Sequence, residues 1–269
     1  MSIPLTDPVM LVYSCILAAA FGAVFGSFIN CTAWRIAHGE NFLKGRSHCA
    51  ECGHALSAAD LVPVFSYLFL RGKCRYCGKK ISPRYMLTEL LLAAAFVCFV
   101  LRFGISGETL RYMGLAVILL GLSLVDLDTY MIPNGFIIAG IIWWAVTIPL
   151  VLSPEKEGNL FTRMGTDPLS GMIGAFLIAG GMLLMVLVFD KISGKETMGG
   201  GDIKLFFVAG LYLGTAVGFF NLILSCVTGL LFVAFMKKRR IPFGPSISLA
   251  TCLSLFIGPA VVSWYISLF

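Results

Sequence analysis

Four cysteines lie together in the longest polar stretch of the chain. They form two C-x2-C pairs separated by 21 residues, and each pair is followed by a glycine, Gly53 or Gly78. Two such pairs can hold four thiolates tetrahedrally around one ion, and zinc favours a closed sulfur shell of this kind in structural sites. Glycine lets the chain turn so that backbone amides face the sulfurs. The spacing therefore predicts a structural zinc site with the ligands Cys49, Cys52, Cys74 and Cys77.

Two other interpretations of these cysteines fit the sequence less well. Two disulfides would require an oxidising compartment, but the charge pattern described below predicts that this segment is cytoplasmic, where disulfides rarely persist. A redox role is disfavoured because the C-x-x-C motif occurs twice and no thioredoxin-like unit surrounds it. His48 and His54 flank the first pair, but four thiolates complete the shell, so both histidines are expected to be exposed.

Two aspartates at the edges of apolar stretches form a second group of residues that could do chemistry. Asp126 ends one stretch in "LVDLDTYMIPN", and Asp202 opens another in "ETMGGGDIKLF". Carboxylates in membrane-spanning segments are costly and therefore suggest function. We expect both at the same membrane depth on the same side, where paired carboxylates can share a proton and activate a water as general base and general acid. Asp128 lies two residues after Asp126 and points to a different helix face, so these two are not expected to pair.

Other roles stay open for the charged residues of these segments. Asp202 could cap a helix, although one glycine would suffice for a cap and the three before it indicate a hinge or a close backbone contact. A phosphate-binding loop is disfavoured, because no GK[ST] follows and no strand is predicted before it. Glu89 forms either a buried ion pair with Arg84 or another cation, or part of a functional site. Lys204 either tunes the aspartates or extends outward to the membrane interface, and Glu196 has no assigned role.

The composition indicates the elements that must position these residues. Of 269 residues, 58% are hydrophobic and only 13% are charged, and the mean hydropathy is +0.92. Soluble domains carry roughly 45–50% apolar and about 25% charged residues, so the chain is predicted to be an all-α, multi-pass membrane protein. The sixth of about eight expected transmembrane helices is short, and with the seventh it forms either a bent hairpin or a helix broken at Gly214. The expected spans are 8–33, 85–103, 110–127, 134–152, 168–190, 203–213, 215–236 and 245–268.

The distribution of basic residues predicts the orientation. Sixteen of the 20 lysines and arginines fall in the segment 34–84 and in the loops near 128–134, 191–204 and 237–244. These parts are therefore expected in the cytoplasm, with both termini on the other side. The net charge of +6 follows from this topology, so nucleic acid is not an expected partner. The first apolar run lacks a basic leader region and is not expected to be a cleavable signal. The segment 34–84 is too short to form a hydrophobic core of its own, so it is expected to need a staple such as a bound metal.

In their order and spacing, five motifs carry a resemblance to a known family. They are "GSFINCTAWRI" at 26–36, the paired cysteines, "DLDTYMIPN", "KETMGGGDIK" and "IPFGPSISLA". Together they resemble the bacterial type IV prepilin leader peptidases, which are membrane aspartic proteases with a GxGD motif. The resemblance implies that Asp126, which Pro133 follows after six residues, is the first catalytic aspartate, with Asp128 as the runner-up. It implies that Asp202, the aspartate of GxGD, is the second.

The resemblance also implies an activity and a location. Family members cut the short basic leader of type IV prepilins or pseudopilins at the cytoplasmic face of the bacterial inner membrane. Many members with the cysteine region also N-methylate the new amino terminus with S-adenosylmethionine. The expected cofactors and partners are therefore zinc, this methyl donor, a prepilin or pseudopilin substrate and the lipid bilayer. The implied division is a first transmembrane helix (1–33), a cytoplasmic four-cysteine zinc-binding region (34–84) and a transmembrane aspartic protease core (85–269).

Two alternatives to this bifunctional enzyme are consistent with the sequence. One is a protease only, whose zinc region is structural or docks the substrate. The other is a zinc-stapled membrane scaffold or transporter, which would cut no peptide. The residues that would bind the methyl donor stay unassigned. Acidic and aromatic side chains in the right region are Glu40, Asp60, Tyr67, Tyr76 and Glu89.

Overall fold

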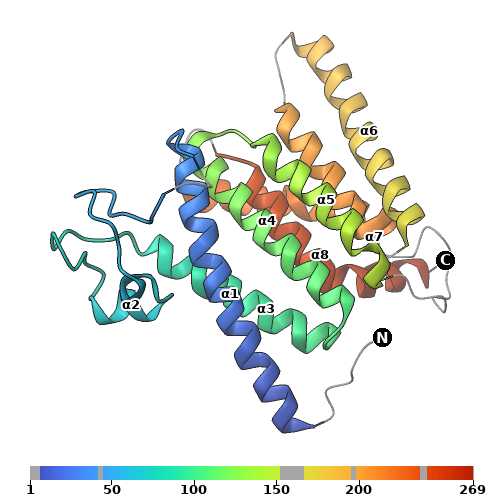
Figure 1. Ribbon diagram of the computed structural model, residues 1–269. Coiled ribbons are helices and arrows are strands. Elements are labelled where there is room, and N and C mark those ends of the chain that lie inside the picture. The colour runs from blue at the N-terminus through green and yellow to red at the C-terminus, as the bar shows by residue number, and fades with distance from the viewer. Residues whose placement is uncertain (1–6, 42–44, 152–166, 195–197, 237–240, 269) are drawn as a thin grey trace. The chain divides into compact units, whose positions relative to one another are not determined.

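The structure is a computed structural model that describes residues 7–41, 45–151, 167–194, 198–236 and 241–268 (Figure 1). Regular structure in these residues is helical, apart from two isolated β-bridges, which confirms the predicted all-α fold. Seven of the described helices are long and apolar enough to cross a membrane. The elements are α1 (Pro8–Ala37), η1 (Ala58–Leu61), α2 (Phe65–Phe69), α3 (Arg84–Phe103), α4 (Gly107–Thr129), α5 (Asn134–Val151), α6 (Pro168–Ser193), α7 (Gly200–Met236) and α8 (Gly244–Ile266).

The chain divides into two compact units, residues 2–125 and 126–269. In the first unit, α1 packs directly on α3 because glycines remove the side chains between them. A Cβ on Gly22 would lie 2.6 Å from the Cα of Ala93, and one on Gly26 would lie 2.8 Å from the Cα of Glu89. Small residues four apart allow this close approach of helices in a membrane. The contact fixes Glu89 against α1.

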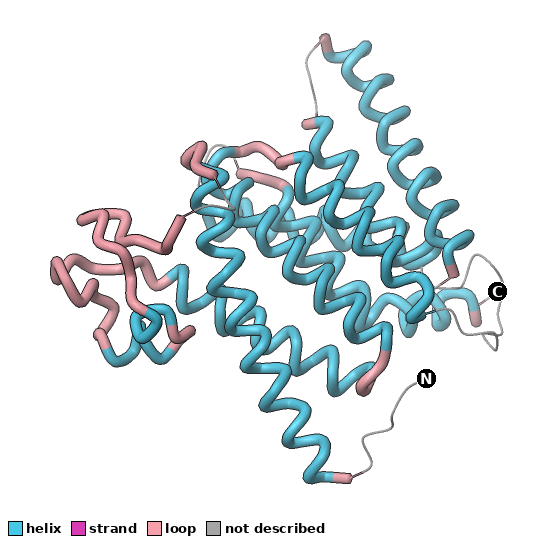
Figure 2. Tube along the Cα trace, in the orientation of Figure 1, coloured by secondary structure: helices cyan, strands magenta, loops and turns pink. Residues whose placement is uncertain are grey.

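The segment between α1 and α3 is an insertion that is mostly loop (Figure 2). The helices among its described residues are η1 and the five-residue α2. Among its described residues, 38–41 and 45–83, only Gly72 and Cys74 are buried. A segment with so little apolar burial cannot offset the entropy of ordering its chain. This agrees with the expectation that the region needs a staple.

In the second unit, α7 folds back on itself at Gly214, whose backbone angles (φ 71°, ψ −169°) are not helical. Phe206 and Gly229 would lie about 34 Å apart on a straight helix. Both nevertheless contact the Phe243 ring: the ring centroids of Phe206 and Phe243 are 6.4 Å apart, and a Cβ on Gly229 would lie 2.8 Å from the ring. The predicted sixth and seventh spans are therefore one bent hairpin, which explains why seven long helices are found where about eight were expected.

Close backbone contacts hold the first half of α7 against α6. A Cβ on Gly174 would lie 2.5 Å from the carbonyl carbon of Gly214, and one on Gly210 would lie 2.6 Å from the Cα of Ala175. Beyond the bend, α8 packs closely on a side chain of α7, since a Cβ on Gly258 would lie 2.5 Å from Val217 Cγ1. These contacts fix the helix whose first turn carries Asp202.

Candidate functional site

The four predicted cysteines come together in the insertion. Their Sγ atoms all lie within 4.8 Å of one another, and none of them forms a disulfide. Four thiolates around zinc, with Zn–S bonds of about 2.3 Å, place their sulfurs about 3.8 Å apart. The cluster therefore fits a tetrahedral metal ion after small side-chain adjustments. Cys49, Cys52, Cys74 and Cys77 could hold a metal, as the spacing predicts.

Two matching turns present the sulfurs. In each turn the amide after the second cysteine bonds back to the first: Gly53 N donates to Cys49 O at 2.8 Å, and Gly78 N donates to Cys74 O at 3.0 Å. The φ angles of these glycines, 69° and 71°, are left-handed, which glycine adopts without the penalty of a Cβ. The glycines noted in the sequence are thus required by the backbone of each turn.

The electrostatics of the cluster favour a bound cation. Backbone amides of Cys77 and Tyr76 lower the pKa of Cys74 to about 7. Although the Lys79 amide favours the Cys77 thiolate, burial and the neighbouring cysteine thiols together raise the pKa of Cys77 to about 11. The Cys77 thiolate is therefore disfavoured unless positive charge is added, and a divalent metal would supply that charge.

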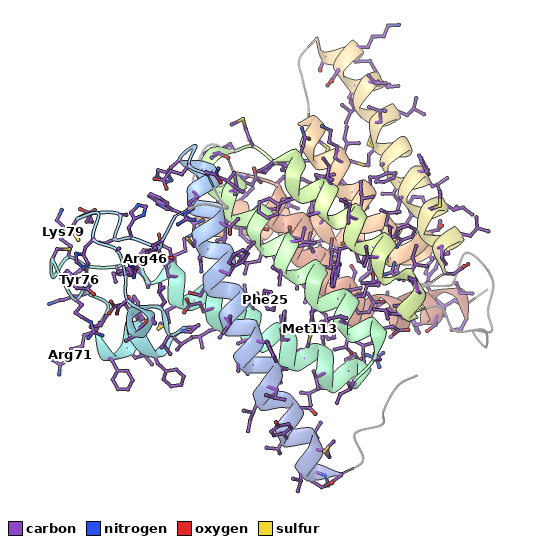
Figure 3. All side chains as sticks on the ribbon, in the orientation of Figure 1. Phe25, Arg46, Arg71, Tyr76, Lys79 and Met113 are labelled. Carbon is purple, nitrogen blue, oxygen red and sulfur yellow. The ribbon has the colours of Figure 1, made fainter. Side chains whose placement is uncertain are left out.

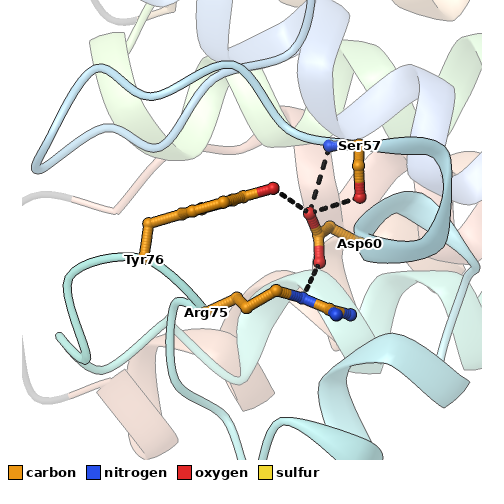
Figure 4. Close-up of polar contacts among 4 residues, drawn as sticks. All are labelled: Ser57, Asp60, Arg75 and Tyr76. Atoms are coloured by element: carbon orange, nitrogen blue, oxygen red, sulfur yellow. Dashed lines mark hydrogen bonds and ion pairs between the residues drawn. The ribbon is translucent and has the colours of Figure 1, made fainter.

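Asp60 ties the second cysteine pair to the turn before α2 (Figure 4). Its Oδ1 accepts from Arg75 Nε at 2.6 Å, and its Oδ2 accepts from Tyr76 OH at 3.1 Å and from Ser57 N and Oγ at 3.1 and 2.7 Å. Arg75 and Tyr76 are the two residues between Cys74 and Cys77. The Ser57 hydroxyl is the main cause that lowers the pKa of Asp60 to about 2. Sequence reasoning gave Asp60 no role, although Ser57 and Asp60 have the spacing of a capping box.

A second, exposed ion pair links the two cysteine turns. Lys79, beside the second pair, bonds to Glu51, which lies between Cys49 and Cys52. The Glu51 carboxylate raises the pKa of Lys79.

Figure 3 shows Lys79 with Arg46 and Arg71 on the insertion. Of the two histidines expected to be exposed, His54 is exposed and His48 is half-buried.

Asp126 and Asp202 belong to the same unit, residues 126–269. Asp126 is buried, and its Oδ2 accepts from Gly244 N, at the start of α8, at 2.9 Å. Asp202 lies in the first turn of α7, and its carboxylate is near enough to feel the charge of Asp126. Asp128 is exposed, so Asp126 and Asp128 lie on different sides of α4 as expected.

The glycine run before Asp202 has a structural reason. The helix already begins at Gly200, so the interpretation of Asp202 as an N-cap is wrong. A Cβ on Gly201 would lie 2.9 Å from Ile132 Cβ, which is the close backbone contact that the run suggested. Lys204 Nζ donates to Asn134 Oδ1 at 2.9 Å and so joins the start of α7 to the start of α5. Glu196 lies outside the described residues.

Glu89 is buried, but not in an ion pair among the described residues. Its Oε2 accepts from Val64 N at 2.7 Å, and Arg84 Nη2 instead donates to Leu124 O at 2.9 Å. The buried ion pair considered for Glu89, with Arg84 or another cation, is therefore not found among the described residues. Val64 and Glu89 are 25 residues apart in the sequence, so no local pattern could have indicated this hydrogen bond.

Fold and site together define a multi-pass helical membrane protein with a four-cysteine insertion after its first helix. It also has two aspartates at helix ends, one of which, Asp126, is bonded to the start of α8. Residues 20–103 match the bacterial peptidase A24 N-terminal domain, and residues 113–234 match the type IV leader peptidase family. The chain belongs to the type IV leader peptidase family, and it is therefore classed as an enzyme.

Curated relatives resemble nearly the whole chain. A Bacillus subtilis "prepilin leader peptidase/N-methyltransferase" is 31% identical and covers 92% of this chain and 96% of its own length. An Escherichia coli "type 4 prepilin-like proteins leader peptide-processing enzyme" is 32% identical over 90% of this chain and 93% of its own length. An Aeromonas hydrophila "prepilin leader peptidase/N-methyltransferase" is 33% identical over 85% of this chain and 77% of its own length. No solved structure matches the chain.

Proposed function

We propose that this protein cuts the leader from type IV prepilins or pseudopilins and N-methylates the new amino terminus. The observation that supports the peptidase role is that Asp202, in the first turn of α7, lies within electrostatic range of Asp126, which Gly244 N holds. The methyltransferase role is supported by the four-cysteine insertion and by the names of the Bacillus subtilis and Aeromonas hydrophila relatives.

Cleavage uses the two carboxylates as a pair. Two like charges in one site cannot both ionise readily, so the pair holds one proton. The ionised aspartate takes a proton from water as the water oxygen attacks the scissile carbonyl carbon. The protonated aspartate then gives its proton to the amide nitrogen as the C–N bond breaks, which leaves a free carboxylate and a new amine. Asp126 and Asp202 are the proposed catalytic residues.

The position of the pair suits the proposed substrate. Both aspartates lie at helix ends, and the distribution of basic residues supports a cytoplasmic location for these ends, at the inner membrane that we propose as the site of the enzyme. There water is available for hydrolysis, while an apolar pilin helix can lie in lipid beside the exposed faces of the spans. A basic leader would remain on the side that carries most of the lysines and arginines of the chain.

The four-cysteine region is proposed to hold structural zinc. The thiol distances, the two amide-lined turns and the low apolar burial of the insertion support this role. S-adenosylmethionine, when bound, supplies a methyl group: a C–N bond forms, the S–C bond breaks with its electron pair left on sulfur, and the nitrogen loses a proton. The chain must then bind this donor and orient a neutral amine toward it.

A cleavage assay with product mass tests both activities. Purified protein is incubated with a prepilin and S-adenosylmethionine, and the product is examined by mass spectrometry. Asp126→Asn and Asp202→Asn should each lower the cleavage rate by about 10³-fold or more, within the range of acid–base catalysis. Asp128→Asn is the matched control and should cut normally. Full cleavage by either of the first two variants would refute the pair.

The same assay separates the remaining alternatives. A cut product with one added methyl group supports the bifunctional enzyme. A cut product that is never methylated, with the donor supplied and metal bound, would leave a protease only. No cut of any prepilin would favour the scaffold or transporter.

A further inference from the structure

A cavity of about 400 Å³ lies in the first unit, between α1, α3 and the insertion. Ser27 and Trp34 line it from α1, Met86 and Glu89 line it from α3, and Tyr67 and Leu70 line it from the insertion. Sites for small molecules usually have volumes of about 300–1,000 Å³, with mainly apolar walls and a few polar groups. The cavity belongs to residues 2–125 and contains neither Asp126 nor Asp202, so it is a second site.

Glu89 is the charged group in this cavity that most needs a partner. Only 7% of the residue is exposed, and its carboxylate accepts one hydrogen bond, from Val64 N. Within the described residues it makes no ion pair. A buried carboxylate without a countercharge is costly and is a functional hypothesis inside a membrane-spanning helix. A ligand group that carries positive charge would supply the partner that Glu89 lacks.

The backbone beside Glu89 is held in an unusual conformation. Val64 has a φ of 62°, which is left-handed and rare for a β-branched residue. This turn aims its amide at Glu89 Oε2, and such conformations gather at functional sites. Val64 and Glu89 together fix the carboxylate at the cavity wall.

The other walls suit a flat heteroaromatic group and a carboxylate. Trp34, Tyr67 and Tyr85 all line the cavity and offer aromatic faces for stacking and for cation–π contact. The Arg35 guanidinium also lines it, oriented by bonds from Nη2 to Gly45 O and Arg46 O at 3.0 and 3.1 Å. A ligand with an aromatic base, a cationic centre and a carboxylate would match all three features.

We propose that this cavity is the methyl-donor site and that Glu89 neutralises the positive charge of S-adenosylmethionine. That donor combines an adenine ring, a sulfonium and an amino acid end, which are the groups that the walls match. The proposal rests on the proposed methyltransferase activity and assigns it a place. Cys49 and Cys74 also line the cavity, so the metal cluster shapes one of its walls.

Two variants test the site by direct binding of the donor. Glu89→Gln can still accept from Val64 N but loses the charge, and Ser27→Phe fills the cavity from α1. Equilibrium dialysis of the metal-loaded full-length protein in detergent, with methyl-tritiated S-adenosylmethionine, measures the dissociation constant. Glu89→Gln should weaken binding about tenfold or more, as expected for a lost charge-assisted contact. Ser27→Phe should abolish saturable binding.

Matched controls separate the site from misfolding. Glu108→Gln removes a carboxylate outside the cavity, and Val24→Phe adds the same ring at an exposed position of α1. Both should bind the donor like the wild type, and all four variants should still cut prepilin.

Two results would overturn the proposal, and they have different meanings. If the wild type binds the donor and methylates, but Glu89→Gln and Ser27→Phe bind equally well, the site is wrong and the activity stands. If the wild type cuts prepilin but neither binds the donor nor methylates, the site and the methyltransferase activity are both wrong.

Discussion

Replacing Asp60 with asparagine should loosen the metal centre without touching a cysteine. The side chain of Asp60 is only 3% exposed and holds the residues between Cys74 and Cys77 through Arg75 and Tyr76. Asparagine keeps the size of the side chain but loses the charge and one acceptor oxygen. The substitution should therefore weaken the hydrogen bonds that hold the second cysteine turn in place.

The magnitude follows from the pKa of Asp60, which falls from 3.8 to about 2. A full shift of this size corresponds to roughly 2 kcal/mol for the whole hydrogen-bond network of Asp60, to which the Ser57 hydroxyl contributes most, and solvent around the half-exposed Arg75 reduces it to about 1–2 kcal/mol. Because the pKa is lowered, this stabilisation is present above about pH 4 and is lost as the pH falls toward 2. Between pH 6 and 8 the effect of Asp60→Asn should therefore be constant.

Zinc release to a colorimetric chelator at neutral pH measures this effect. Asp60→Asn should release zinc about 5- to 30-fold faster than the wild type, which corresponds to about 1–2 kcal/mol. Glu51→Gln is the matched control, because it breaks the exposed pair with Lys79 and should change the rate by about twofold or less. The reasoning would be refuted if Asp60→Asn released zinc at the wild-type rate, or if Glu51→Gln accelerated zinc release more than Asp60→Asn does.

Three further predictions concern the bend, the glycine run and the metal. Gly214→Ala, at φ 71°, should lower the melting temperature in a thermal unfolding assay, whereas Gly180→Ala, with no atom within 4 Å of its added Cβ, should not. Gly201→Ala should slow prepilin cleavage about 10- to 100-fold, since the new Cβ displaces the start of α7 from Ile132; wild-type rates would count against this contact as a positioning device. Removal of zinc by a chelator should abolish binding of S-adenosylmethionine in the dialysis assay, because the cluster shapes the cavity wall, and unchanged binding would separate the two sites.

The sequence predicted best the features that local spacing determines. The cysteine cluster followed from two short motifs, each with a glycine that its turn needs. The helical class followed from composition, because backbone groups in lipid must be paired within the segment. The sequence indicated a break at Gly214 but did not decide between a bent hairpin and a broken helix. That outcome depends on how Phe206 and Gly229 contact Phe243. The catalytic roles of the aspartates stay predictions.

The features that the sequence did not indicate are contacts between residues far apart in the chain. An ion pair of Glu89 with Arg84 or another cation was one expectation, yet its partner is a backbone amide of the insertion. Asp202 was considered as a cap because it stands at the start of an apolar stretch, yet the helix starts two residues earlier. In both cases a local pattern was outweighed by tertiary packing that no single segment encodes.

The start of α8 explains why one of the two aspartates is fixed so firmly. The first amides of a helix have no partner within the helix, and a buried donor without a partner is costly. Gly244 is the first residue of α8, and Pro245, the next, has no amide hydrogen to offer. The Gly244 amide therefore needs an acceptor. The Asp126 carboxylate needs a donor that fixes its position better than water would. Their bond meets both needs, so the motif "IPFGPS" positions Asp126 as directly as the glycine run positions Asp202.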